Sequence, residues 1–129
     1  MENVDNHWAK NRVLKFDFEV SDSQVPKNII FVVRNNNDYP YSNLRIISTL
    51  QERGRKNAKP DTLNYVLAKP NGEWIGSGFG DTKEILFQYR LNHMFPKNGR
   101  YTVTVQQAMR KDTLSGIEDF GVKLEQAQP

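Results

Sequence analysis

A continuous apolar run at residues 29–33 limits the possible folds of this chain more than any other feature. It reads Ile-Ile-Phe-Val-Val, and β-branched and aromatic residues in such a run are typical of a strand buried on both faces. The ten residues that follow read Arg-Asn-Asn-Asn-Asp-Tyr-Pro-Tyr-Ser-Asn. A hairpin needs only two turn residues, so this long polar and aromatic loop is a candidate recognition surface on a rigid β scaffold.

Period-two patterning predicts strands along most of the remaining chain. In residues 13–20 apolar and charged side chains alternate, as in a half-buried strand. Further strands are expected at residues 28–34, 44–51, 61–69, 73–77, 85–91, 100–107 and 117–125. The apolar residues of 85–91 also fit part of a helix, but a strand is favoured there. Pro70-Asn71-Gly72 predicts a tight turn. Residues 1–11 read as a loose lead-in with Trp8 as an anchor, and residues 109–116 as a loop.

This spacing of short strands predicts an all-β fold, an antiparallel β-sandwich of about eight strands and of jelly-roll type. The sandwich is expected to form a single domain over residues 12–126, followed by a frayed tail at residues 127–129. A chain of 129 residues is long enough to bury roughly two-thirds of the surface that its unfolded form exposes.

Composition excludes several classes of site. The formal net charge is +3, too small to indicate nucleic acid binding without a concentrated basic patch. The chain has no cysteine, which excludes disulfides, thiolate metal ligands and a cysteine nucleophile. No apolar run approaches the roughly 20 residues of a membrane-spanning helix, and the first ten residues lack the apolar core of a signal peptide.

Five segments, taken together and in order, resemble a known family. They are residues 34–43, 61–63, 72–80, 101–117 and 119–122. The specific parts are a Trp-x-Gly-x-Gly-x-Gly pattern that begins at Trp74 and a Gln-Ala-Met-Arg stretch that ends at Arg110. From about Trp8 to Glu125 the chain resembles the GldH family of gliding-motility lipoproteins of Bacteroidetes-type bacteria.

The resemblance implies a cell-envelope lipoprotein, anchored by a lipid on a cysteine and facing the periplasm. It implies an association with gliding and its coupled secretion machinery, with other envelope proteins as partners. It supplies no catalytic residue, so we expect a non-enzymatic component without cofactors. Because the chain contains no cysteine, we expect the anchor to precede residue 1 and residues 1–11 to follow it.

The predicted contact surface combines the polar and aromatic loop with two distant segments. Its members are Asn36, Asp38, Tyr39, Tyr41, Asn43, Trp74 and Arg110. A carbohydrate-binding module on the same fold is the alternative, with Tyr39, Tyr41 and Trp74 as an aromatic platform. A purely structural interpretation is also open, in which the two tyrosines plug a corner of the sandwich and Trp74 fills the core.

Three ligand-binding hypotheses carry less weight than a structural explanation. Gly76, Gly78 and Gly80 alternate like part of a phosphate loop, but Asp81 stands where the dinucleotide pattern requires glycine, so a bulge or strand crossing is favoured. Residues 35–38 offer one carboxylate, too few for calcium, and favour turns through their asparagines. The two histidines, His7 and His93, have no zinc-site spacing.

The most concentrated charge lies in the segment of residues 52–60. Arg53, Arg55, Lys56 and Lys59 are interleaved with glycine and asparagine and lack aromatic neighbours. Such a run is typical of a solvated loop. Contact with anionic lipid head groups is the alternative interpretation for an envelope protein.

Overall fold

The apolar run of residues 29–33 lies in strand β4 (Lys27–Asn35), which has a neighbouring strand on each side in a four-stranded sheet, as the run predicts. The computed structural model describes residues 1–54, 59–78 and 80–127, and all regular elements over this part of the chain are strands. The first sheet has the order β1-β10-β4-β7. Its strands are β1 (Glu2–Asn3), β10 (Ile117–Gln126), β4 (Lys27–Asn35) and β7 (Lys83–His93).

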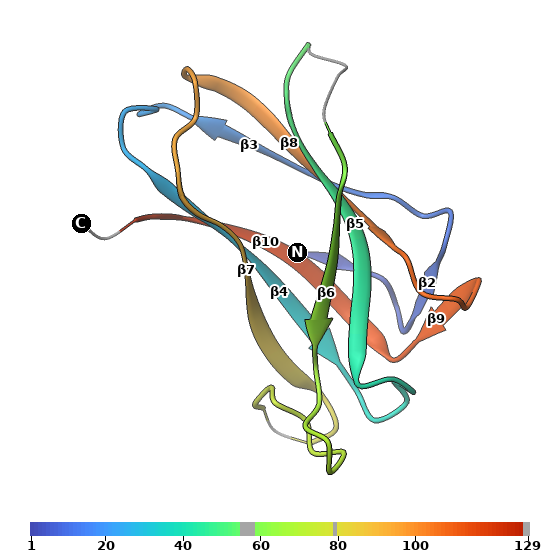
Figure 1. Cartoon of the computed structure of the whole chain (residues 1–129). Coiled ribbons are helices and arrows are strands. Elements are labelled where there is room, and N and C mark those ends of the chain that lie inside the picture. Colours follow the sequence, from blue (N-terminus) through green and yellow to red (C-terminus); the bar gives the residue numbers. More distant parts are fainter. Residues whose placement is uncertain (55–58, 79, 128–129) are drawn as a thin grey trace.

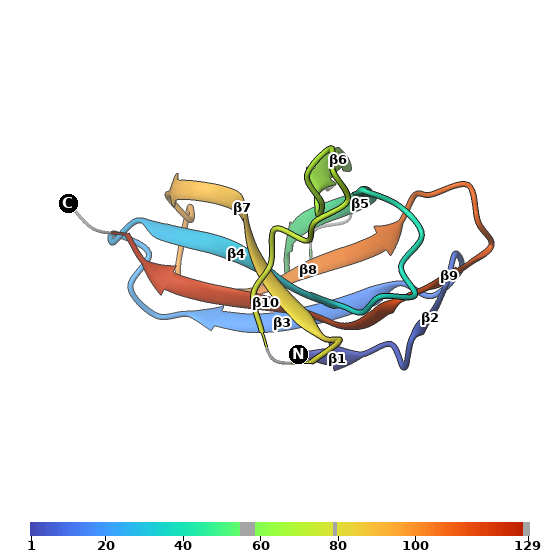
Figure 2. The same cartoon turned by 90° about the horizontal axis from the view of Figure 1, so that it is seen from below.

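A second four-stranded sheet packs against the first, and all pairings in both are antiparallel (Figure 1). It has the order β3-β8-β5-β6, from β3 (Leu14–Val20), β8 (Gly99–Gln107), β5 (Asn43–Glu52) and β6 (Asp61–Val66). A small pair, β2 (His7–Ala9) with β9 (Thr113–Ser115), lies at one end of the sandwich (Figure 2).

The core between the sheets is rich in aromatic rings. Phe31 on β4 is fully buried and stacks on Tyr89 at 4.7 Å between ring centroids. Phe120 on β10 lies 5.2 Å from Phe31 and 5.5 Å from Trp8. Aromatic side chains bury a large area each, so a chain with 37% hydrophobic residues still assembles a continuous core.

The edges of the two sheets are joined by aromatic and polar contacts between β6 and β7. The ring of Tyr65 stacks on Phe87 at 4.3 Å, and its hydroxyl donates to the Gln88 carbonyl at 3.1 Å. Asp61 accepts from the Tyr89 hydroxyl at 2.9 Å and from the Arg90 guanidinium at 2.6 Å. These contacts bridge neighbouring strands of opposite sheets, which share no ladder hydrogen bonds.

The predicted antiparallel all-β sandwich is confirmed, with three differences in its strands. Residues 1–11, expected as a loose lead-in, contain β1 and β2, and Trp8 is fully buried. The expected loop of residues 109–116 contains β9, which pairs with β2. The expected strand at residues 73–77 is wrong, because only isolated bridges form, at Trp74 and Ser77.

The glycine-rich segment explains why no strand forms there. A Cβ atom at Gly76 would lie 2.8 Å from the Glu84 carbonyl oxygen, so the two backbones approach closely, as expected from a glycine inside a strand pattern. Ser77 and Glu84 exchange two backbone hydrogen bonds at 3.0 and 2.9 Å. The segment therefore meets the beginning of β7 through a single antiparallel bridge and forms no longer ladder with it.

The strand orders are compatible with the jelly-roll form that we expected. Apart from the β2–β9 pair, eight strands divide equally between the sheets. The jelly-roll detail stays a prediction, as do the domain limits. Of the tail at residues 127–129 only Ala127, which is buried, belongs to the described part. Within that part, no helix is long and apolar enough to cross a membrane.

Candidate partner-binding surface

Tyr39, at the centre of the loop between β4 and β5, is a structural residue. Its side chain is 3% exposed, and its hydroxyl donates a hydrogen bond to the Asn43 carbonyl. Burial raises the pKa of Tyr39, and the neighbouring Tyr41 adds to the effect, so the phenol stays neutral. The interpretation of Tyr39 as a corner plug is therefore the one that its burial supports.

The rings of Tyr41 and Trp74 both pack against this plug. Tyr41 meets the Tyr39 ring edge-on at 5.9 Å, and Trp74 lies 6.3 Å from it. Both rings are half-buried. The Trp74 indole N–H donates to the Asn37 side chain at 3.0 Å. Trp74 thus closes the loop from outside and is not a residue of the deep core.

Asn36 and Asp38 form the turn that the asparagine-rich sequence predicts. The Asn36 side-chain oxygen accepts from the Asp38 backbone N–H at 2.9 Å, an Asx turn. The Asn36 amide donates to Asn6 at 2.8 Å and to Glu118 at 3.2 Å. Asn36 is therefore occupied with holding the loop against the sheet, whereas Asp38 is exposed to solvent.

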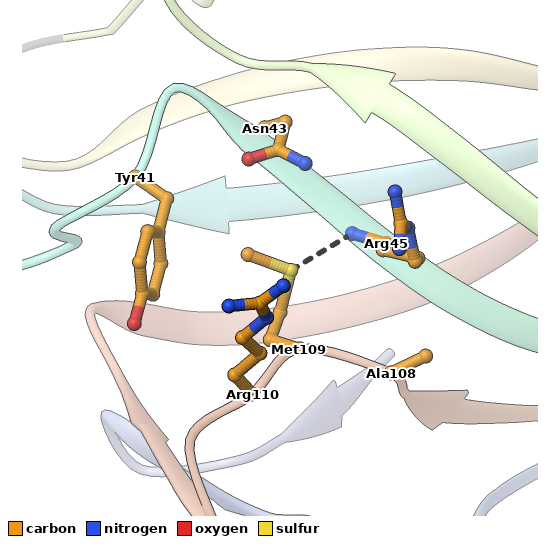
Figure 3. A pocket seen from close by; sticks show the side chains of 6 residues that line it. All are labelled: Tyr41, Asn43, Arg45, Ala108, Met109 and Arg110. Carbon is orange, nitrogen blue, oxygen red and sulfur yellow. Dashed lines mark hydrogen bonds between the residues drawn. The ribbon is translucent and has the colours of Figure 1, made fainter.

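A pocket of about 240 Å³ opens beside this loop, where β5 begins and β8 has ended (Figure 3). Its lining comes from two chain segments that are far apart in the sequence. The residues are Tyr41, Asn43, Arg45, Ala108, Met109 and Arg110. In Figure 3, Tyr41 and Arg45 stand on opposite sides, with Met109 and Arg110 between them. The pocket therefore has an aromatic wall, a thioether floor and two guanidinium groups.

The backbone around Met109 is fixed from below by a buried glutamine. Gln107 is 1% exposed; its amide oxygen accepts from the Met109 N–H at 2.9 Å, and its amide nitrogen donates to the Lys111 carbonyl at 2.9 Å. Arg110 lies between these two attachment points. The Met109 sulfur also accepts from the Arg45 backbone N–H at 3.2 Å, which ties the turn to β5.

The two arginines of the pocket lack anionic partners among the described residues. Neither guanidinium takes part in an ion pair or side-chain hydrogen bond there, and no acidic residue lines the pocket. Both side chains are exposed. In contrast, Arg34 on the neighbouring sheet pairs with Glu84 at 2.8 Å and with Asp119 at 3.7 Å. The pocket is thus a local concentration of unneutralised positive charge.

The structure groups only part of the predicted surface. Tyr41, Asn43 and Arg110 line the pocket together, Tyr39 and Trp74 support the loop beside it, and Asn36 faces the sheet. Arg45, Ala108 and Met109 also line the pocket but were not among the residues predicted from the sequence. The outward position of Arg45 in the alternating pattern of residues 44–51 was a usable signal, and so was the Gln-Ala-Met-Arg stretch itself.

The other candidate sites gain no new ligand set from the structure. Among residues 1–54, 59–78 and 80–127, no three histidine, aspartate or glutamate side chains gather as metal ligands. His7 lies on β2 and His93 at the end of β7. Arg55 and Lys56 of the expected basic loop lie outside the described residues. Arg53 and Lys59, at its borders, are both exposed.

Comparison with known proteins gives one family. A family model described as GldH lipoprotein matches residues 1–124. A protein of Christiangramia forsetii named "Gliding motility lipoprotein GldH homolog" is 40% identical over 129 residues, which cover 95% of this chain and 79% of the relative. The "Gliding motility lipoprotein GldH" of Flavobacterium johnsoniae is 36% identical over 132 residues, which cover 97% and 81%. No solved structure matches. The chain therefore belongs to the GldH lipoprotein family.

Proposed function

We propose that this chain is a non-enzymatic component of the gliding apparatus and its coupled secretion machinery. It is held at the cell envelope by a lipid anchor, faces the periplasm, and acts by contact with other envelope proteins. Family membership and the names of the two relatives support the setting. The observation that carries the contact role is the pocket in which Tyr41, Asn43 and Arg110 meet.

The residue types of this pocket suit a protein partner. Tyrosine, methionine and arginine are enriched at the centres of protein interfaces. Tyr41 is held by the buried Tyr39, and Met109 is held by Gln107. A wall and floor that are fixed before binding lose little conformational entropy on association. The face around the pocket is therefore our proposed contact surface, together with Asp38, which is exposed on the loop that bears Tyr41.

Site-specific photocrosslinking in a gliding bacterium tests this proposal. A photoreactive amino acid replaces Tyr41 or Arg110 in the full-length protein, and Lys15, exposed on β3, serves as the control position. We expect adducts at positions 41 and 110 with a subunit whose deletion stops colony spreading, identified by mass spectrometry. Equal adducts at position 15, or none at the pocket, would overturn the contact role.

The position of Tyr39 changes how the surface is tested by mutation. Tyr39→Ala would empty a buried aromatic site, at a cost of about 3–5 kcal/mol, so loss of partner capture in that variant reports unfolding. Tyr41→Ala removes a half-buried ring and leaves the plug in place. We expect Tyr41→Ala to lose partner capture while its thermal transition stays cooperative.

The anchor and its orientation need their own experiment. Metabolic labelling with an alkyne-bearing fatty acid should mark the full-length protein, and substitution of its lipidated cysteine should abolish the label. Protease added to intact cells should spare the domain, whereas protease added after outer-membrane disruption should cleave it. Cleavage in intact cells would place the domain on the outer surface and contradict the periplasmic orientation.

The carbohydrate-binding alternative has less support. A sugar platform needs a flat exposed ring, but Tyr39 is buried and the Trp74 indole is engaged with Asn37. Titration of tryptophan fluorescence with oligosaccharides separates the two functions, because Trp74 is half-buried whereas Trp8 is fully buried. Saturable quenching would support the carbohydrate-binding function instead.

A further inference from the structure

We infer that the pocket between β5 and the turn after β8 binds a carboxylate-bearing segment of a partner protein. This inference rests on the proposed contact function and specifies the chemical class of the partner segment that is bound. Arg45 and Arg110 line one pocket from opposite chain segments, and neither has an anionic partner among the described residues. Two unpaired guanidinium groups at one concavity favour an anionic occupant.

The geometry of the pocket favours a side chain over a larger anion. A volume of about 240 Å³ accommodates a few side chains or a short peptide stretch. The guanidinium fork matches a carboxylate with two parallel hydrogen bonds. The Asn43 side chain, also in the lining, is held by donating to Asn64 at 2.6 Å, so its oxygen stays free to accept from a peptide N–H.

The residues that line the pocket favour a carboxylate-bearing peptide over a membrane surface as the binding partner. Polybasic lipid-binding patches gather about four to eight lysines and arginines, whereas the described residues that line this pocket include two arginines and no lysine. Tyr41 and Met109 contribute apolar area beside the charges. Nucleic acid is disfavoured for the same reason, since its affinity grows with the number of phosphates neutralised and the net charge is only +3.

The pocket is preorganised on both sides. On one side, Tyr39 is fixed by its hydrogen bond to the Asn43 carbonyl and holds Tyr41. On the other side, two of the hydrogen bonds of the Gln107 side chain fix the backbone that flanks Arg110. We therefore assign Gln107 as a positioning residue, which acts on the occupant only through the turn that it holds.

Titration followed by ¹H–¹⁵N NMR tests the inference directly. The probes are a short peptide of aspartate, glutamate and glycine and its neutral twin with asparagine and glutamine. We expect saturable shifts of the Arg45 and Arg110 side-chain signals and of the Met109 amide with the acidic peptide only. Binding should weaken as salt rises above about 0.1 M, because screening acts on exposed charges.

Charge-removing variants provide the matched comparison. Arg45→Gln and Arg110→Gln should each weaken peptide binding about tenfold, and the double variant should show no saturable binding. Arg110→Lys keeps the charge without the fork and should lie between the wild type and Arg110→Gln. Arg100→Gln removes an exposed arginine at the far end of β8 and should leave binding unchanged.

Three outcomes would overturn the inference. They are equal binding of both peptides, insensitivity to the double variant, and arginine-dependent binding of phosphatidylglycerol vesicles without peptide binding. Photocrosslinking at position 41 then separates the two levels of the proposal. If crosslinks to a gliding subunit persist while the acidic peptide fails to bind, the contact function is supported and the inference of a carboxylate-bearing occupant is wrong. If the crosslinks are absent, the contact function itself fails.

Discussion

Gly116 lies directly against the backbone of Tyr39. A Cβ atom at position 116 would overlap the Tyr39 backbone nitrogen and Cα, and Gly116 has φ +92°, a conformation that costs other residues energy. Its carbonyl accepts from the Asn36 N–H at 2.8 Å. This contact joins the start of β10 to the loop that bears the aromatic plug.

Gly116→Ala should therefore be strongly destabilising. We expect a loss on the order of 3 kcal/mol in the free energy of unfolding, from the strained φ together with the overlap. Gly72→Ala is the matched control, since Gly72 has φ +89° but a Cβ atom added there would have no heavy atom within 4 Å, and it should cost about 1 kcal/mol. Urea unfolding gives both values, and equal losses would show that the contact contributes nothing.

Tyr39→Phe should isolate the hydroxyl of the plug. The variant keeps the buried ring but leaves the Asn43 carbonyl without its donor, at an expected cost of about 1–2 kcal/mol. Thermal unfolding measures this loss. Tyr41→Phe is the control, because the described structure gives the Tyr41 hydroxyl no hydrogen bond within the chain, and its stability should stay within about 0.5 kcal/mol of the wild type.

Asp61→Asn should loosen the joint between β6 and β7. Asp61 serves both the Tyr89 hydroxyl and the Arg90 guanidinium, and the amide cannot replace its charge. We expect a loss of about 1–2 kcal/mol, with faster hydrogen exchange along β6. Asp17→Asn removes an exposed carboxylate bonded to Thr102 at 2.5 Å and should cost less than about 0.5 kcal/mol.

Mild acid should destabilise the fold through His93. Burial lowers the pKa of His93, and the nearby Arg90 lowers it further; Lys27 faces His93 across the ladder. The folded state thus disfavours the imidazolium. The contribution of neutral His93 to the free energy of unfolding is therefore fully present above the unfolded-state pKa of about 6.5, and it is lost as pH falls through the folded-state pKa. Urea midpoints at several pH values should fall less in His93→Gln than in the wild type, whereas exposed His7→Gln should behave like the wild type.

Gln107→Leu should weaken acidic-peptide binding without removing any charge. Loss of the amide releases the Met109 N–H and the Lys111 carbonyl, so the backbone around Arg110 becomes mobile before binding. We expect binding several-fold weaker and faster exchange of the Met109 amide. Unchanged binding despite faster exchange would show that Gln107 positions nothing in the pocket.

The strands of the sandwich follow from local pattern, whereas the pocket follows from topology. Alternation in residues 13–20 and the apolar run at 29–33 each specify which faces are buried, and that is local information. The segment expected as a strand at 73–77 instead lies with Gly76 against the backbone of Glu84. The alternating glycines favour a bulge or strand crossing there, but they do not reveal which distant segment is contacted.

The site shows the same division between local and long-range information. Tyr39 and Tyr41 stand in one loop and look alike in the sequence, yet one is buried and the other lines the pocket. Arg45 joins Arg110 only because β5 pairs with β8 in the register Ile46 to Gln107. Residue type marked the loop as a candidate surface, but the pairing of distant strands decided which side chains form it.

The pairing of β5 with β8 also determines when the pocket forms during folding. Half of the pocket comes from residues 41–45 and half from residues 108–110, so the pocket does not exist in a chain whose strands are not yet paired. A partner that contacts both arginines at once, as we propose, would therefore bind only a domain in which β5 and β8 are already paired.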